Sequence, residues 1–328
     1  MKSRELSRFA LSACVPTVIL AGCGASQPPI SAPGLLHNVS QGSKIVRAQS
    51  VGQAYKMSGP LLYVASYAET LEPLAIYNAK TDDPEPIATI SKDIDNSSGT
   101  CIDGDGTLYV SNDASPGWVS EYALGQTKPL RVITKGINTP AFCAIDASGN
   151  LWVTDLGLDD VAEYLKGSTT PHATITKGLT YPDGIAIDHA GNLYVGNLEP
   201  QSAPNIQVYA SGSKSPSRTI TDGVTWPVGI AIDAHDTLYV TNGGESGSIE
   251  EYRSGQSTPY RTITDELVYP ADVVLNKNGW LYVSNYGHNS GGQAILEFPP
   301  RSLKPSSREI TKGFFNPEGL AYYPPVLP

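Results

Sequence analysis

The chain has 328 residues, of which 40% are hydrophobic and 16% are charged, and its formal net charge is −10. This negative charge argues against nucleic acids and anionic membrane surfaces as partners, because both repel it. The hydrophobic content is enough for a large core, and all-β chains of this length often fold as one unit.

The first residues have the features of an export signal. A basic start precedes a mostly apolar run over residues 9–20, which is too short to span a bilayer. The sequence Leu20-Ala21-Gly22-Cys23 follows this run and resembles the lipobox of bacterial lipoproteins, in which the cysteine is acylated. We therefore expect a signal peptide over residues 1–22 and a lipid on Cys23. The alternative is an ordinary secretory signal in which the cysteine occurs by chance.

A polar segment rich in Gly, Ser and Pro comes next, and it lacks sustained periodicity. We interpret residues 23–58 as the lipidated cysteine and a flexible tether, and residues 59–328 as the folded domain. Several acyl chains anchor a protein stably, whereas one chain does not. The expected location is the bacterial cell envelope. Because no Asp follows Cys23, resemblance to lipoprotein sorting implies the outer membrane if the organism is Gram-negative.

A Leu-aromatic-Val motif then recurs six times along the chain, at Leu62, Leu108, Leu151, Leu193, Leu238 and Leu281. Three further series keep the same period: a third-strand motif ending in Tyr or Phe, a Pro followed by an Ile-Thr strand, and an apolar inner strand preceded by a turn, as in residues 181–188. Four short strands per repeat of about 40 to 50 residues are typical of a β-propeller. We call the turn before each inner strand the lead-in turn.

The two ends of the domain predict how the ring closes. The chain enters at Leu61 on a second strand, so the first unit lacks its inner strand. It finishes with an inner strand over residues 319–323 that has no following partner. Joining the two gives an all-β fold of six four-stranded antiparallel blades, the first closed by the C-terminal strand, and it removes both open sheet edges. The closure should pair residues near 320 with residues near 63.

The repeat resembles the NHL-type propellers. The phrase over residues 182–195, Pro-x-Gly-Ile-Ala-Ile-Asp-x-x-Gly-Asn-Leu-Tyr-Val, is very similar to the NHL core, and the resemblance covers about residues 60–324. It departs from the fullest pattern because the Asn-Arg pair after the second strand is missing. The resemblance implies a propeller that binds ligands or proteins, although some relatives are enzymes.

A short polar residue ends the second strand in each unit: Ser66, Asn112, Asp155, Asn197, Asn242 and Asn285. These residues could form a polar ring that binds a ligand. Their repetition in every blade instead favours a structural interpretation, in which each side chain bonds backbone groups where its strand ends.

Acidic residues are less evenly distributed in the lead-in turns. The position before the motif glycine is acidic in two units only, at Asp183 and Glu318. It resembles the metal-ligand position of the gluconolactonase and senescence-marker propellers, which implies a divalent cation on Asp183 and Glu318, with Asp272 as a third ligand, and a metal-dependent lactonase-like hydrolase at the channel mouth. The other units offer Ser, Ala and Val, which leaves a hard cation short of oxygen ligands. The alternative is that both carboxylates are solvated loop residues.

Three adjacent lead-in turns carry an aromatic residue before the proline, namely Tyr181, Trp226 and Tyr269. Together they could form a platform for a sugar or a peptide. The alternative is that they cover the grooves between blades. With Asp183 and Glu318, they form the predicted ligand site.

Two cysteines remain in the folded domain, on the inner strands of adjacent units and offset by one motif position. A one-residue offset reverses the face of a strand, so Cys101 could point toward Cys143. We expect either a disulfide between them or two small buried thiols.

The sequence therefore predicts a lipid-anchored, extracytoplasmic binding module that acts as a monomer. Its expected partner is an unidentified protein, peptide or carbohydrate, besides the membrane that holds the anchor, and no cofactor is expected. The alternative is the metal-dependent hydrolase, which would need a divalent cation.

Overall fold

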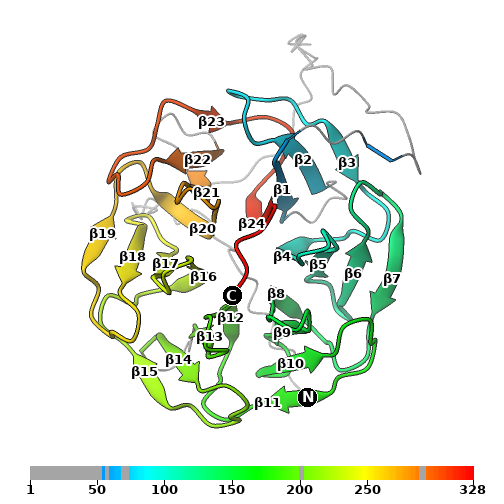
Figure 1. The fold of residues 1–328 in the computed structure, drawn as a ribbon, viewed down its shortest axis with the longest axis vertical. Helices are drawn as coiled ribbons and strands as arrows, with labels where there is room; N and C mark the ends of the chain where they lie inside the picture. The colour runs from blue at the N-terminus through cyan, green and yellow to red at the C-terminus, as the bar shows by residue number, and fades with distance from the viewer. Residues whose placement is uncertain (1–53, 56–58, 68–73, 199–202, 288–292) are drawn as a thin grey trace, which may run out of the picture. The chain divides into compact units, whose positions relative to one another are not determined.

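A computed structural model of the chain describes residues 54–55, 59–67, 74–198, 203–287 and 293–328. The predicted signal peptide and most of the predicted tether, including Cys23, lie outside the described residues. The described elements are strands that form six four-stranded antiparallel sheets around a common axis (Figure 1). This confirms the predicted six-bladed β-propeller. Within the described ranges, no helix is long and apolar enough to cross a membrane.

Each blade is built from an inner strand at the axis and three strands that follow it outward. Blade one contains β24 (Pro317–Tyr323), β1 (Leu61–Ser66), β2 (Leu74–Asn78) and β3 (Ala88–Ile90). Blade two contains β4 (Ser97–Ile102), β5 (Leu108–Asn112), β6 (Trp118–Tyr122) and β7 (Pro129–Ile133). Blade three contains β8 (Pro140–Ile145), β9 (Leu151–Asp155), β10 (Asp160–Tyr164) and β11 (Ala173–Ile175).

The second half of the ring repeats this order. Blade four contains β12 (Pro182–Ile187), β13 (Leu193–Asn197), β14 (Asn205–Tyr209) and β15 (Arg218–Ile220). Blade five contains β16 (Pro227–Ile232), β17 (Leu238–Asn242), β18 (Ser248–Tyr252) and β19 (Arg261–Ile263). Blade six contains β20 (Val268–Leu275), β21 (Leu281–Gly287), β22 (Ala294–Phe298) and β23 (Glu309–Ile310).

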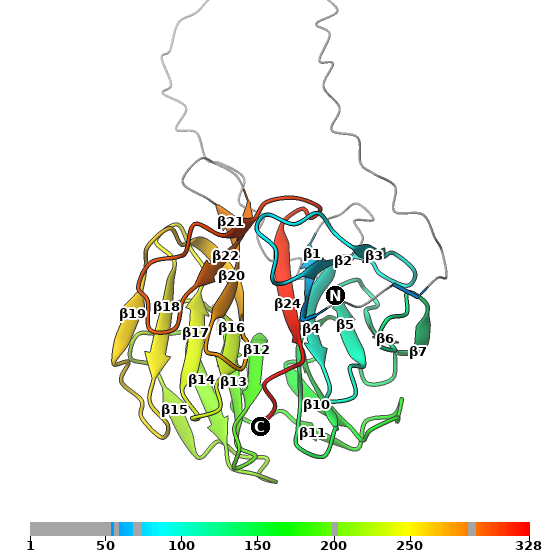
Figure 2. The same ribbon diagram turned by 45° about the horizontal axis from the view of Figure 1, so that its top comes forward.

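The ring closes through the C-terminal strand, as predicted. Strand β24 pairs antiparallel with β1, and the register sets Leu320 opposite Val64 and Ala321 opposite Tyr63. Figures 1 and 2 show β24 beside β1 and the chain running on to the C-terminus at the ring centre. Since β1 would otherwise be an open inner edge, this pairing joins the two ends of the domain into one sheet.

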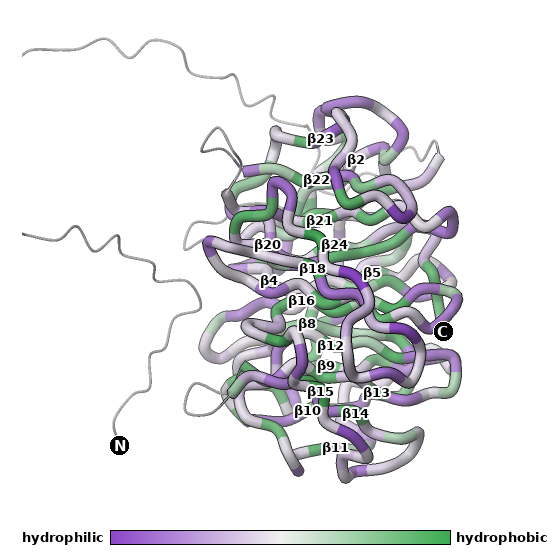
Figure 3. The backbone as a smooth tube through the Cα atoms, turned by 90° about the vertical axis from the view of Figure 1, so that its left-hand side faces the viewer, coloured by the Kyte–Doolittle hydropathy of each residue, from purple (hydrophilic) through white to green (hydrophobic). Residues whose placement is uncertain are grey.

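Apolar residues lie between the blades, where the sheets pack face to face. Figure 3 shows hydrophobic stretches inside the strands and hydrophilic ones in many of the loops. In five blades a buried tyrosine near the end of the third strand donates a hydrogen bond to a carbonyl in the connection that precedes or follows its blade. Examples are Tyr164 to the Lys135 carbonyl at 2.6 Å and Tyr252 to the Asp222 carbonyl at 2.7 Å. A buried tyrosine hydroxyl needs such a partner. The repeated tyrosine therefore holds the connections between blades in place, in addition to packing within its sheet.

The inner strands approach one another closely because each has a β-bulge near its start. In blade four, Pro182 pairs with Asn197 and Ile185 with Val195, so two residues, Asp183 and Gly184, oppose one. Most other blades have a glycine at the corresponding position. A Cβ atom on Gly184 would overlap the Val228 carbonyl oxygen of blade five, so the motif glycine permits the contact between neighbouring inner strands.

Second-strand hydroxyl groups connect neighbouring blades at the same level. The Thr154 hydroxyl accepts a hydrogen bond from the Phe142 N–H at 2.9 Å and donates one to the Asp183 carbonyl of the next blade at 2.7 Å. Thr241 and Ser284 do the same in blades five and six. Each hydroxyl therefore satisfies two buried backbone groups that the bulge removes from the sheet ladder.

One residue of the predicted tether is fixed on the propeller. The Tyr55 hydroxyl lies 2.7 Å from the Tyr63 hydroxyl of blade one, and the Tyr55 N–H donates to the Gly125 carbonyl of blade two at 3.0 Å. Tyr55 therefore contacts blades one and two, although it lies within the segment that the sequence predicts as tether.

We predict that Gly184→Ala lowers the free energy of unfolding by about 2 kcal/mol or more, because the new Cβ overlaps backbone that cannot move independently. Gly104→Ala is the matched control. Its Cβ would lie 3.1 Å from Cδ1 of Leu327, a side chain that can rotate away. Urea unfolding followed by fluorescence measures both variants. Equal midpoints would show that the close approach at the axis does not limit stability.

Candidate functional site

The lead-in turns and the loops between second and third strands lie on one face of the ring, which we call the lead-in face. The polar residue that ends each second strand fixes the lead-in turn of its own blade. Asn242 accepts hydrogen bonds from the Thr225 and Trp226 N–H groups at 2.9 and 3.2 Å, and its amide donates to the Gly223 carbonyl at 2.8 Å. The structural interpretation of this repeated residue is thus confirmed, and its function is to position the turns.

The three predicted aromatic residues occupy corresponding turns of blades four, five and six. Trp226 is 44% exposed, and Tyr181 and Tyr269 are half-buried. The Tyr181 N–H donates to the Asp159 carboxylate at 2.8 Å, and the Tyr269 hydroxyl bonds to the Glu245 carboxylate. All three residues therefore lie in lead-in turns, where the Tyr181 backbone and the Tyr269 hydroxyl are bonded to carboxylates.

The lead-in face carries further apolar groups that the sequence analysis did not include. Phe315, in the lead-in turn of blade one, is 52% exposed, and Leu158, in the loop between β9 and β10, is 43% exposed. Loops between second and third strands are outside the motif series. The order of the strands alone places these loops on the lead-in face, so the position of Leu158 on this face could have been predicted from the sequence.

The two acidic residues lie deeper than the sequence suggested. Asp183 and Glu318 are the second residues of β12 and β24, and both are buried. They are not solvated loop residues, because the bulge draws this part of each strand toward the axis. Their backbone carbonyls accept hydrogen bonds from Thr154 and Ser284.

Asp272 connects blade six to the closing strand. It occupies the position of the motif glycine, and its carboxylate accepts hydrogen bonds from the Val273 and Leu320 N–H groups, both at 2.8 Å. Burial raises the pKa of Asp272 from 3.8 to about 7, the two N–H groups oppose this rise, and the Asp183 carboxylate adds to it. Its main role is to hold β24 in the ring.

These three acidic side chains are not grouped in a way that could hold a metal ion. Among the described residues, no group of three or more His, Cys, Asp or Glu side chains is placed to hold a metal ion. Asp183, Glu318 and Asp272 are all described and so do not make up such a group. Both Asp272 oxygens already accept backbone hydrogen bonds, so this residue is a poor third ligand.

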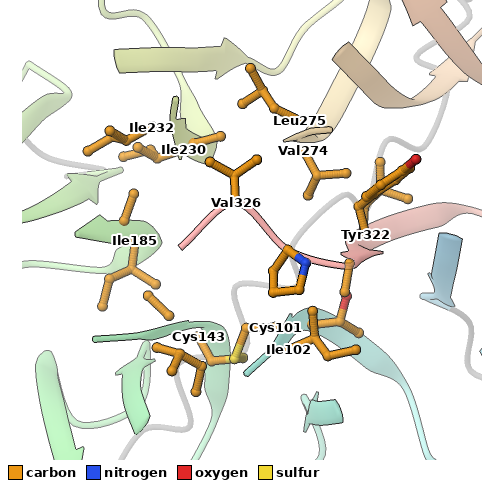
Figure 4. Close-up of a pocket in the computed structure, with 18 of the residues that line it drawn as sticks. Cys101, Ile102, Cys143, Ile185, Ile230, Ile232, Val274, Leu275, Tyr322 and Val326 are labelled. Carbon is orange, nitrogen blue, oxygen red and sulfur yellow. A yellow bond between two sulfur atoms is a disulfide. The ribbon is translucent and has the colours of Figure 1, made fainter. Parts of the chain in front are cut away.

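The channel contains a cavity lined mainly by apolar residues, with Thr100 and Asp272 among them, which the sequence analysis did not predict. Its volume is about 150 Å³, and the inner strands supply its walls. Figure 4 shows Val326 from the C-terminal tail among Ile185, Ile230, Val274 and Tyr322. The tail leaves β24 on the face opposite the lead-in turns, so the chain itself covers this mouth of the channel.

The two cysteines also border this cavity. Cys101 on β4 and Cys143 on β8 are joined by a disulfide, with their Cα atoms 5.7 Å apart. The bond crosses from blade two to blade three on the channel side. It therefore links two neighbouring sheets covalently, next to the tail that covers the channel.

The raised pKa of Asp272 has a consequence for stability. Between about pH 4 and pH 7 the folded protein keeps a proton that the unfolded chain releases, so the contribution of this group falls as pH rises through that window. We predict that Asp272→Asn flattens the decline in unfolding free energy over this range. Urea titrations at several pH values measure it, with the exposed Asp265→Asn as control. A slope unchanged by Asp272→Asn would contradict the assignment.

Comparison with known proteins supports the fold alone. No protein-family model matches the chain. No curated protein matches it either. Among solved structures, a chain of the nidogen–laminin complex has a TM-score of 0.66 at 20% identity, covering 80% of this chain and 98% of that one. A Bacteroides caccae protein of unknown function gives 0.63 at 15%, covering 81% and 99%. A candidate 6-phosphogluconolactonase from Bacteroides fragilis gives 0.57 at 13%, covering 81% and 98%. These similarities agree with a six-bladed propeller.

Proposed function

We propose that this protein is a binding module whose partner docks on the lead-in face, across Tyr181, Trp226 and Tyr269. The observation that carries the proposal is the backbone conformation of the two tyrosines. Tyr181 has φ +55° and Tyr269 has φ +52°, in the left-handed region that bulky residues rarely adopt.

The corresponding position in other blades is occupied by a residue that adopts this conformation with less strain. Blades one and two also have a residue with positive φ directly before the inner strand. This residue is Asn316 in blade one and Asn96 in blade two. Asparagine tolerates positive φ well, whereas a strained position costs of order 1–3 kcal/mol. Tyrosine in this place is therefore costly for the fold, and a contribution to binding a partner would offset that cost.

The composition of the lead-in face supports the same conclusion. Trp226, Phe315 and Leu158 are large apolar residues and each is more than 40% exposed. An aromatic side chain offers a wide contact surface with few rotatable bonds, which suits both the rings of a sugar and the side chains of a peptide. We infer that the ligand is a glycan or a peptide that spans several blades.

The strain argument predicts the effect of replacing the tyrosines. Tyr181→Asn and Tyr269→Asn should each leave the free energy of unfolding unchanged or raise it by about 1 kcal/mol, because asparagine relieves the left-handed backbone. If the tyrosines only covered the grooves between blades, both variants would lose stability. Urea unfolding of each variant separates the two outcomes.

The binding itself can be tested with glycan and peptide arrays. We expect the wild type to bind defined probes and the triple variant Tyr181→Asn, Trp226→Asn, Tyr269→Asn to lose them. The control replaces three comparably exposed leucines away from this face, Leu130, Leu165 and Leu303, by asparagine. Equal loss in both triple variants, or no loss in either, would contradict a site on the lead-in face.

We further propose that the propeller is exported and held in the bacterial cell envelope by a lipid on Cys23, at the outer membrane if the organism is Gram-negative. The lipobox-like sequence supports this, as does the polar tether between Cys23 and Tyr55. Cys23→Ser should abolish incorporation of labelled palmitate and release the exported protein from the membrane fraction. Continued palmitate labelling of this variant would contradict the assignment.

A further inference from the structure

The face opposite the lead-in turns carries two grooves of the same construction. One lies between blades three and four and the other between blades five and six, with volumes of about 390 and 560 Å³. Each groove is bordered by the turn after the inner strand in both of its blades. A volume of this size accommodates a small molecule.

The two grooves differ sharply in charge. Among its described lining residues, the groove of blades three and four has the carboxylates of Asp146 and Glu163 and no Lys or Arg. The groove of blades five and six is lined by Arg261, Lys277 and Arg301. Two carboxylates, Asp233 and Glu251, line the same groove, so its three cations leave it with a positive balance in a chain of net charge −10.

The turn sequence of blade six explains part of this difference. Blades two to five begin the turn with an aspartate, whereas blade six has Asn276 followed by Lys277. The Asn276 amide oxygen accepts hydrogen bonds from the Asn278 and Trp280 N–H groups at 2.9 and 3.2 Å, as the aspartates do in the other blades. The turn therefore keeps its shape while its charge changes from negative to positive.

The basic groove is also rigid at its base. Glu251 is fully buried, and its carboxylate accepts hydrogen bonds from the Arg261 Nε–H and from the Tyr260 hydroxyl, both at 2.7 Å. Tyr260 is nevertheless 43% exposed, and the Arg253 guanidinium lies 4.3 Å from its ring centre. One buried carboxylate thus holds an arginine and an aromatic ring in fixed positions at the groove.

Cations remain available at the rim of this groove. Within the described part of the chain, neither Lys277 nor Arg301 has an ion pair, and both side chains are exposed. The Asp233 carboxylate, which also lines the groove, is engaged by the His235 and Thr237 N–H groups and the Tyr239 hydroxyl. An anion entering the groove would meet two cations without local partners and one oriented arginine.

We propose that the groove between blades five and six binds a monosaccharide-sized organic anion, with its carboxylate or phosphate at Lys277 and Arg301 and its ring against Tyr260. Because this groove is more positive than the groove of blades three and four, we infer that its ligand is negatively charged. Because the Tyr260 ring is exposed and held in place, we infer that the ligand has a ring that packs against it. This site is on the face opposite the proposed docking surface and is independent of it.

Isothermal titration of the full chain with glucuronate, glucose 1-phosphate, glucose and inorganic phosphate tests the proposal. We expect one or both sugar anions to bind, and glucose and inorganic phosphate to bind at least tenfold more weakly. Preference for glucuronate identifies a carboxylate site, and preference for glucose 1-phosphate a phosphate site. No binding of either sugar anion at about 10 mM, or equal binding of inorganic phosphate, would overturn the proposal.

Variants locate the binding. Lys277→Gln with Arg301→Gln should weaken sugar-anion binding at least tenfold, and Lys135→Gln, which removes a cation elsewhere, should not. Tyr260→Phe keeps the ring and should retain binding, whereas Tyr260→Ala should weaken it. Trp226→Asn, on the other face, should leave this binding intact even if it abolishes the array signal. Full affinity in the Lys277 and Arg301 double variant would show that the anion binds elsewhere.

Discussion

The close approach of six inner strands at the axis is the constraint on which the rest of the structure depends. At each bulge, backbone groups near the axis lose their partners in the sheet ladder. Hydroxyls such as Thr154 and Thr241 accept a hydrogen bond from an N–H group of their own blade and donate one to a carbonyl of the next blade. Glycines such as Gly184 make room for the neighbouring backbone. A blade is too thin to bury both of its faces alone, so this shared network turns six marginal sheets into one unit.

One departure of the repeat from its motif serves ring closure. Asp272 replaces a motif glycine beside the closing strand, and its carboxylate bonds the Leu320 N–H there. The ring has to be closed at this point by a strand far away in sequence, so an extra polar contact between β20 and β24 has a clear structural use. The buried position of Asp183 and Glu318 follows from the same geometry.

The two faces of the ring differ in their surface features. The lead-in face offers exposed aromatic and aliphatic groups, including Trp226 and Phe315, on turns fixed by second-strand asparagines. The opposite face offers grooves between blades, with the central mouth covered by Val326 and its neighbours. The proposed docking surface and the proposed anion groove are therefore separated by the length of a strand.

The sequence alone determined the fold, because four short strands in a repeated order with turn residues between them leave few alternatives, and the unmatched strands at Leu61 and at residues 319–323 determined how the ring closes. It also identified Tyr181, Trp226 and Tyr269 as corresponding residues. Only the tertiary structure decided that Asp183 and Glu318 are buried, that Tyr55 is fixed on the blades and that Val326 covers the channel. These outcomes depend on the bulge and on contacts between blades, which bring together residues that no local pattern relates. The same holds for the basic groove, since Arg261 and Lys277 belong to different blades and meet only when the sheets pack side by side.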